Sequence, residues 1–99
     1  MLVATNGDFE APVRVYHWWS GKEWRYGSPI PSFLIKEVEK RGSKYLTYVE
    51  TYAPDAYVLW DHATCCPRDT PSRKMGRKIA LGRLNKRLRA WHGLEVIER

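Results

Sequence analysis

Residues 71–91 carry the pattern that most constrains the fold of this chain of 99 residues. Thr70 belongs to the residue types that cap a helix, and Pro71 to those favoured at the first helical position. Apolar side chains then recur along one side of a helical wheel, at Ala80, Leu81, Leu84, Leu88 and Trp91. Gly93 follows them and is typical of a helix end. The sequence therefore predicts one helix over residues 71–91, whose apolar stripe requires a partner surface elsewhere in the chain.

The part of the chain before this helix favours β-strands. Residues 12–19, 44–52 and 56–61 are rich in β-branched and aromatic side chains, which fit a pleated surface. Residues 23–26 offer a partner for the first of these strands across a short turn. Residues 94–97 predict a short final strand. We therefore predict an α+β fold: a small antiparallel sheet or open β-barrel with one C-terminal basic amphipathic helix packed on it.

Residues 32–40 fit two structures. Ser32 has the side chain of an N-cap and Gly42 is typical of a helix end, which together favour a short helix. Residues 35–40 also fit a strand that turns back and pairs with the following strand, residues 44–52. Because strands that are neighbours in sequence frequently pair, we favour the hairpin and keep the helix as the alternative.

Length and composition fit one domain over residues 1–99, β-rich over residues 1–66. Hydrophobic residues make up 43% of the chain, with five Trp and six Tyr, so there is enough apolar material to fill a core, which argues against intrinsic disorder. No apolar run approaches the roughly 20 residues of a membrane helix, and we expect no membrane partner. The first residues lack the basic and apolar regions of a secretory signal.

Positive charge is concentrated in the predicted helix. Residues 1–69 hold eight Lys or Arg against nine Asp or Glu, while residues 70–94 hold eight Lys or Arg and no acid. The net charge of +6 therefore originates in one element. The candidate binding residues are its cations outside the apolar stripe: Arg73, Lys74, Lys78, Arg83, Lys86, Arg87 and Arg89.

A helix face with cations alone indicates an anionic partner, because like charges on neighbouring turns repel one another. The backbone of nucleic acid is the commonest partner of this kind. In the alternative interpretation, the cations pair with the acids of the β-rich part or are simply hydrated. Met75 and Ile79 lie on the basic side, so we expect the rest of the chain to cover the first two turns on both sides.

Aromatic residues near the N-terminus extend the nucleic-acid hypothesis. Exposed aromatic rings stack on bases, and one predicted hairpin carries Trp18, Trp19, Trp24 and Tyr26. Alternation along a strand sends Trp18 and Trp19 to opposite faces, so at least one of them belongs to the core.

Residues that carry chemistry in other proteins are sparse here. His62, Cys65 and Cys66 lie close in sequence, but no second ligand pair follows at the spacing of a zinc site. The adjacent cysteines are too close for an unstrained disulfide, so we expect them to be reduced, in a cytoplasm. Paired carboxylates and a Gly-rich phosphate loop do not occur. We predict no enzyme activity, no catalytic residues, no metal and no cofactor.

Two segments form a recognisable combination: residues 66–69, Cys-Pro-Arg-Asp, and residues 72–84, Ser-Arg-Lys-Met-Gly-Arg-Lys-Ile-Ala-Leu-Gly-Arg-Leu. The combination resembles the end of small bacteriophage proteins, in which a Cys-x-x-Asp loop precedes a Lys-x-Gly-Arg-x-x-Ala-x-Gly-Arg-Leu helix. Residues 38–49 resemble the small β-roll that precedes this helix in the same proteins. The resemblance implies a phage origin and the cytoplasm of a host cell, and it implies no particular activity.

The same motif also has a structural interpretation. Gly76 and Gly82 disfavour a helix, so we expect them where the helix packs closely on the sheet. Arg77 falls inside the apolar stripe and therefore needs a carboxylate partner, for which Asp69 and Asp61 are the nearest candidates.

These observations predict a non-enzymatic, phage-type protein that binds nucleic acid or a nucleoprotein complex through its basic helix. The alternative is a phage-encoded inhibitor that docks on a host enzyme or an anti-phage defence enzyme. In that case the cations would meet an acidic protein surface.

Overall fold

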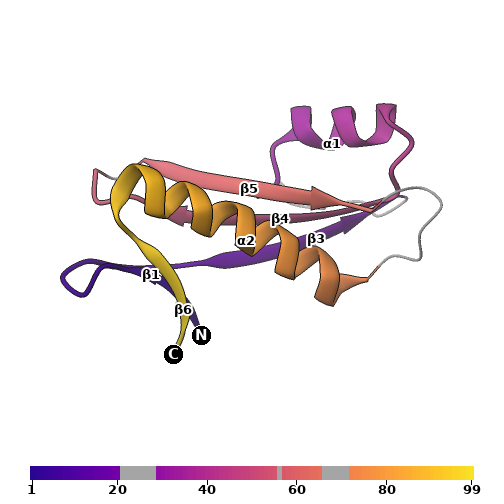
Figure 1. The fold of residues 1–99 in the computed structure, drawn as a ribbon. Helices are drawn as coiled ribbons and strands as arrows, with labels where there is room; N and C mark the ends of the chain where they lie inside the picture. Colours follow the sequence, from indigo (N-terminus) through magenta and orange to yellow (C-terminus); the bar gives the residue numbers. More distant parts are fainter. Residues whose placement is uncertain (21–28, 56, 66–71) are drawn as a thin grey trace.

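The computed structural model describes residues 1–20, 29–55, 57–65 and 72–99. Over these ranges the chain forms two antiparallel three-stranded sheets and two helices (Figure 1). In chain order the elements are β1 (Leu2–Thr5), β2 (Glu10–Pro12), β3 (Arg14–Trp19), α1 (Ser32–Lys40), β4 (Tyr45–Tyr52), β5 (Val58–Thr64), α2 (Arg73–His92) and β6 (Glu95–Glu98). The C-terminal helix α2 packs on the β3-β4-β5 sheet, which confirms the predicted α+β class. The described strands do not close into a barrel.

The chain changes sheet at Val13. The first sheet has the order β2-β1-β6 and the second the order β3-β4-β5, so β2 and β3 belong to different sheets. Val13 lies between them, and its amide donates to the Leu2 carbonyl at 3.0 Å. Strand β6 returns beside β1 and brings the Met1 amine within 2.9 Å of a Glu98 carboxylate oxygen. The two termini therefore lie together at one end of the molecule (Figure 1).

Most of the predicted strands are present, but the first begins at Arg14 and not at Pro12, which belongs to β2 of the other sheet. Strand β3 pairs with β4 along its whole length, and β4 pairs with β5, so β5 is an edge strand of its sheet. Strand β5 starts and ends later than predicted, at Val58 and Thr64. Strand β6 follows α2 as predicted. Residues 23–26, the predicted partner of the first strand, lie outside the described residues.

The predicted strand over residues 35–40 is wrong, because Ser32–Lys40 form the helix α1. Leu34 and Val38 lie one turn apart, and both are buried in a cluster with Leu46 of β4. On a strand, Lys36 would share a face with these two residues, but Lys36 is exposed, which matches the period of a helix and not that of a strand.

Gly42 explains why the local pattern fitted both structures. Its φ of 80° is the left-handed conformation used in hairpin turns and at helix ends alike. Here the Gly42 amide donates to the Glu39 carbonyl and the Ser43 amide to the Val38 carbonyl, which is the Schellman arrangement at a helix C-terminus.

Helix α2 begins two residues later than predicted. Its N-cap is Ser72, whose hydroxyl accepts a hydrogen bond from the Met75 amide at 3.2 Å. The predicted cap residues Thr70 and Pro71 lie outside the described residues. Gly93 ends the helix in a left-handed conformation, as predicted.

The apolar stripe of α2 is confirmed only in its middle. The fully buried residues are Ala80, Leu84 and Leu88, and they pack with Val49 and Ala63 of the sheet. Trp91, however, is 80% exposed, because it lies beside Val58 at the first residue of β5, where the strand gives no cover. Met75 and Ile79 are exposed as well, so the sheet covers the first turns on one side only.

The two glycines of α2 differ in their surroundings. A Cβ at Gly76 would overlap the Thr47 hydroxyl on β4, so this position is a close approach of helix to sheet, as predicted. A Cβ at Gly82 would meet nothing within 4 Å, and the prediction of close packing there is wrong.

The two neighbouring tryptophans of β3 lie on opposite faces, as alternation predicts. Trp18 is buried among the residues beneath α1, at 3% exposure. Trp19 stacks on Tyr45 on the other face, with ring centroids 6.5 Å apart. Trp24 and Tyr26 lie outside the described residues, so the predicted aromatic platform stays a prediction.

Candidate functional site

The arginines and the lysines of α2 differ in the contacts that they make. Each of its five arginines contacts a described residue elsewhere in the chain, whereas none of its three lysines forms a hydrogen bond or ion pair with a described residue. The seven predicted binding residues therefore do not form one equivalent set.

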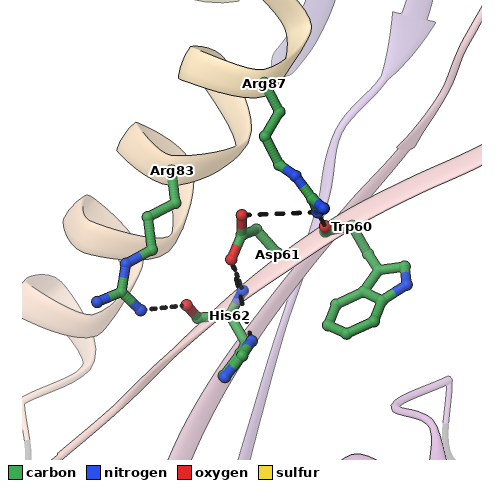
Figure 2. A network of polar contacts seen from close by, with 5 residues as sticks. All are labelled: Trp60, Asp61, His62, Arg83 and Arg87. Atoms are coloured by element: carbon green, nitrogen blue, oxygen red, sulfur yellow. Dashed lines mark hydrogen bonds and ion pairs between the residues drawn. The ribbon is translucent and has the colours of Figure 1, made fainter.

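Arg83 and Arg87 are one turn apart on α2 and face the free edge of β5 (Figure 2). Arg83 donates to the His62 carbonyl at 2.8 Å, and Arg87 donates to the Trp60 carbonyl at 2.7 Å. Between these carbonyls, the His62 amide donates to Asp61 Oδ1 at 2.8 Å. Asp61 Oδ2 lies 3.8 Å from the Arg87 guanidinium.

This network occupies the backbone groups that an edge strand otherwise offers to another strand. A free edge is a template for pairing with a second chain, and proteins protect such edges by covering them. Arg83 and Arg87 therefore contribute to the fold. Their remaining N–H groups stay accessible, because both side chains are exposed.

The other three arginines lie along the remaining length of the helix. Arg73 lies over the Trp19 ring, 5.0 Å from its centroid, in a cation–π contact. Arg89 pairs with Glu95 at 3.1 Å. Arg77 is half exposed and lies 3.9 Å from Glu98, so its predicted burial in the apolar stripe and its pairing with Asp61 are both wrong. Asp69, the other predicted partner, lies outside the described residues.

The three lysines of α2 form an outward row. Lys74, Lys78 and Lys86 are exposed and stand at multiples of four residues from one another, so they form a row that winds by about 120° around the helix from Lys74 to Lys86. Gly82 occupies the missing place in this spacing. Lys74 and Lys86 are twelve residues apart, which is about 18 Å along the helix axis. We call these three residues the lysine row.

A groove runs between α2 and the edge of β5. One part, of about 280 Å³, is lined by Val58, Leu59, Trp60, Arg87, Trp91 and His92. A second part, of about 460 Å³, is lined by Trp60, Asp61, His62, Arg83, Lys86 and Arg87. The two parts adjoin, since Trp60 and Arg87 line both. We call the whole the edge groove.

Only the cations of the edge groove are among the predicted binding residues, and Trp91 is predicted in the buried stripe instead. Its position on the helical wheel places it with Leu84 and Leu88, and the sheet covers those two but not Trp91. The available signal was its place in the last turn before Gly93, where a helix commonly extends past its partner surface.

A small polar cluster lies near the N-terminus of α2. The Tyr45 hydroxyl is 2.7 Å from His17 Nδ1, and the Thr47 hydroxyl is 3.2 Å from the same atom. Burial, reinforced by the positive charges of Arg73 and Arg77, lowers the pKa of His17. The ring is therefore neutral at pH 7, and the cluster connects β3 to β4.

Comparisons with known proteins give no family. A scan against protein-family models, a search of curated proteins and a search of solved structures found no significant match to this chain. The described residues contain no group of three or more His, Cys, Asp or Glu side chains suited to a metal ion. They also contain no helix long and apolar enough to cross a membrane. Cys66 lies outside the described residues, so the predicted reduced state of the cysteine pair stays a prediction.

Proposed function

We propose that this chain is a non-enzymatic binding protein whose lysine row contacts the phosphate backbone of nucleic acid, free or within a nucleoprotein complex. The observation that carries the proposal is the difference in contacts between the arginines and the lysines of α2. The arginines contact described residues of the chain, and Lys74, Lys78 and Lys86 project outward with no acid anywhere on the helix. A phage protein acting in the cytoplasm of its host is the setting that the sequence resemblance favours.

The dimensions of the lysine row support this proposal. Its length of about 18 Å equals the rise of about five nucleotides along one strand of B-form DNA. Three lysines that neutralise three phosphates release about three counterions. The logarithm of the binding constant should then fall against the logarithm of salt concentration with a slope of about −2.7.

A salt titration tests the proposal. Fluorescence anisotropy with a labelled DNA duplex gives the binding constant of the wild-type protein and of the variant Lys74→Gln/Lys78→Gln/Lys86→Gln. We expect the variant to bind more weakly at low salt and its slope to be flatter by about 2.7, at any DNA sequence. Its thermal stability should stay close to that of the wild type, because all three side chains are exposed.

A matched control separates the lysine row from net charge. The variant Lys36→Gln/Lys40→Gln/Lys44→Gln removes the same three charges from exposed positions on and beside α1. We expect it to retain the wild-type slope. An equal loss in the two triple variants, or no binding of DNA or RNA by the wild type at low salt, would contradict the proposal.

An acidic protein surface is the second candidate partner, and one observation favours it. Met75 and Ile79 are 54% and 39% exposed beside the lysine row, and exposed methionine within a polar rim is typical of protein interfaces. In this case we propose that the chain inhibits a host or defence enzyme. Met75→Ser/Ile79→Ser would then abolish capture of one stoichiometric partner from nuclease-treated host lysate, while DNA binding would be absent in the wild type.

A further inference from the structure

The side chain of Trp91 is far more exposed than those of the other apolar residues on the same side of α2. The ring is 80% exposed on the last turn of α2, although a tryptophan is among the most costly residues to leave in water. Ala90 beside it is also exposed, and Val58 across the groove is 49% exposed. The end of the edge groove is therefore an aromatic and aliphatic surface that no described residue covers.

The rest of the edge groove is positively charged. Arg83 and Arg87 precede Trp91 at intervals of four residues, so the three side chains follow one another along the same flank of α2. Lys86 lines the same part of the groove as Arg83. Against these three cations the groove holds one carboxylate, Asp61, which is already paired with Arg87. An anionic ligand is therefore complementary to the groove.

The central part of the β5 edge is not available to an extended peptide that would add a strand to the sheet. An extended peptide binds a sheet edge through backbone hydrogen bonds. Here the Trp60 carbonyl, the His62 amide and the His62 carbonyl are already bonded to side chains (Figure 2). A ligand of the groove must therefore bind through its charge and its flat apolar groups, which are the groups that a nucleotide offers.

We propose that the edge groove binds single-stranded nucleic acid, with an unstacked base against the Trp91 ring and the adjoining phosphates against Lys86 and the free N–H groups of Arg83 and Arg87. This inference rests on the proposed function and adds strand selectivity to it. Bases inside a duplex are stacked on one another and do not reach an aromatic side chain, whereas single-strand binding proteins use exposed rings in this manner. The lysine row serves either kind of nucleic acid, and Trp91 only the single-stranded kind.

The test compares strand types with one variant. Wild-type protein and Trp91→Ala are titrated against labelled oligo-deoxythymidine, oligo-uridine and a DNA duplex, each of about 12 nucleotides per strand. We expect Trp91→Ala to weaken single-strand binding at least about fivefold and to leave duplex binding unchanged. Trp91→Phe, which retains a flat ring, should recover most of the affinity. The oligo-deoxythymidine and oligo-uridine titrations distinguish a DNA strand from an RNA strand as the ligand.

Met75→Ala is the matched control. Met75 is also an exposed apolar side chain of α2, but it lies sixteen residues before Trp91, about 24 Å along the helix axis. It should leave single-strand affinity unchanged. Equal single-strand affinity for Trp91→Ala and the wild type, or wild-type binding to the duplex alone, would overturn the inference while the proposed function stands. Failure of the wild type to bind any of the three probes at low salt would overturn both.

Discussion

A methyl group added at Gly76 and one added at Gly82 should have opposite effects on stability. Both glycines lie inside α2, where alanine is favoured over glycine by about 1 kcal/mol. At Gly82 the new methyl meets open space, so Gly82→Ala should raise the free energy of unfolding by about 1 kcal/mol. At Gly76 the methyl overlaps the hydroxyl of Thr47 and lies 3.3 Å from its Cβ.

The cost of this overlap sets the expected difference between the variants. Thr47 is fully buried on a central strand, so it cannot move away without shifting β4 or α2. Overpacking of this kind costs about 1–3 kcal/mol. The propensity gain is common to both variants and cancels in the comparison. Gly76→Ala should therefore be less stable than Gly82→Ala by about 1–3 kcal/mol, which in a domain of this size is a difference in Tm of about 4 °C or more.

Thermal and urea unfolding of the two variants measure this difference, and a third substitution identifies its cause. Thr47→Ala removes the overlapping hydroxyl, so the penalty of Gly76→Ala should shrink by at least about 0.5 kcal/mol in the Thr47→Ala background. If Gly76→Ala stabilises the protein as much as Gly82→Ala, then α2 does not approach β4 closely at this point. The packing of helix on sheet described above would then be incorrect.

Three further predictions follow from burial, the strand edge and pH. Trp18→Ala should cost about 3–5 kcal/mol of unfolding free energy and Trp91→Ala less than about 0.5 kcal/mol, because the rings are 3% and 80% exposed. Urea denaturation measures both costs, and equal costs would refute the assignment of Trp18 to the core and Trp91 to the surface. Arg83→Gln/Arg87→Gln should uncover the edge of β5 and cause concentration-dependent self-association in sedimentation velocity, whereas a monomer at all concentrations would count against the edge network. Because the pKa of His17 is lowered in the folded protein, the unfolded chain takes up a proton on this ring first as the pH falls. The contribution of His17 to stability should therefore be complete above about pH 6.5 and decrease below it. Urea titrations at several pH values should show a flatter decrease for His17→Gln than for the wild type.

The parts of the fold that local signals determine were predictable. Helix α2 combines a continuous apolar spacing with a terminal Gly93, and both are properties of neighbouring residues. Helix α1 was not predictable in this manner, because Gly42 serves a hairpin turn and a helix end equally well. The choice depends on burial of Leu34 and Val38 against Leu46 and Trp18, which is packing between separate elements and not a property of neighbouring residues.

The candidate site was predictable in its charge and not in its geometry. The absence of acids on α2 follows from the sequence, and it is the basis of the proposed anionic partner. The position of β5 beside α2 does not follow from the sequence pattern. Arg83 and Arg87 reach backbone carbonyls because β5 lies there. The same strand begins at Val58 beside Trp91 and leaves that ring exposed, which a helical wheel of α2 alone does not reveal.

The division between arginine and lysine on α2 has a chemical reason. A guanidinium carries five donors in a fixed plane, so it can hold a carbonyl and a carboxylate at once, as Arg87 does with Trp60 and Asp61. An ammonium is a compact, strongly hydrated charge on a flexible stem, and it meets a phosphate as a point charge. Eight cations without an acid on one helix would otherwise repel one another and destabilise it. Five of them contact the sheets, including Trp19 and Glu95, and the lysine row is the part of the helix for which we propose an external anion.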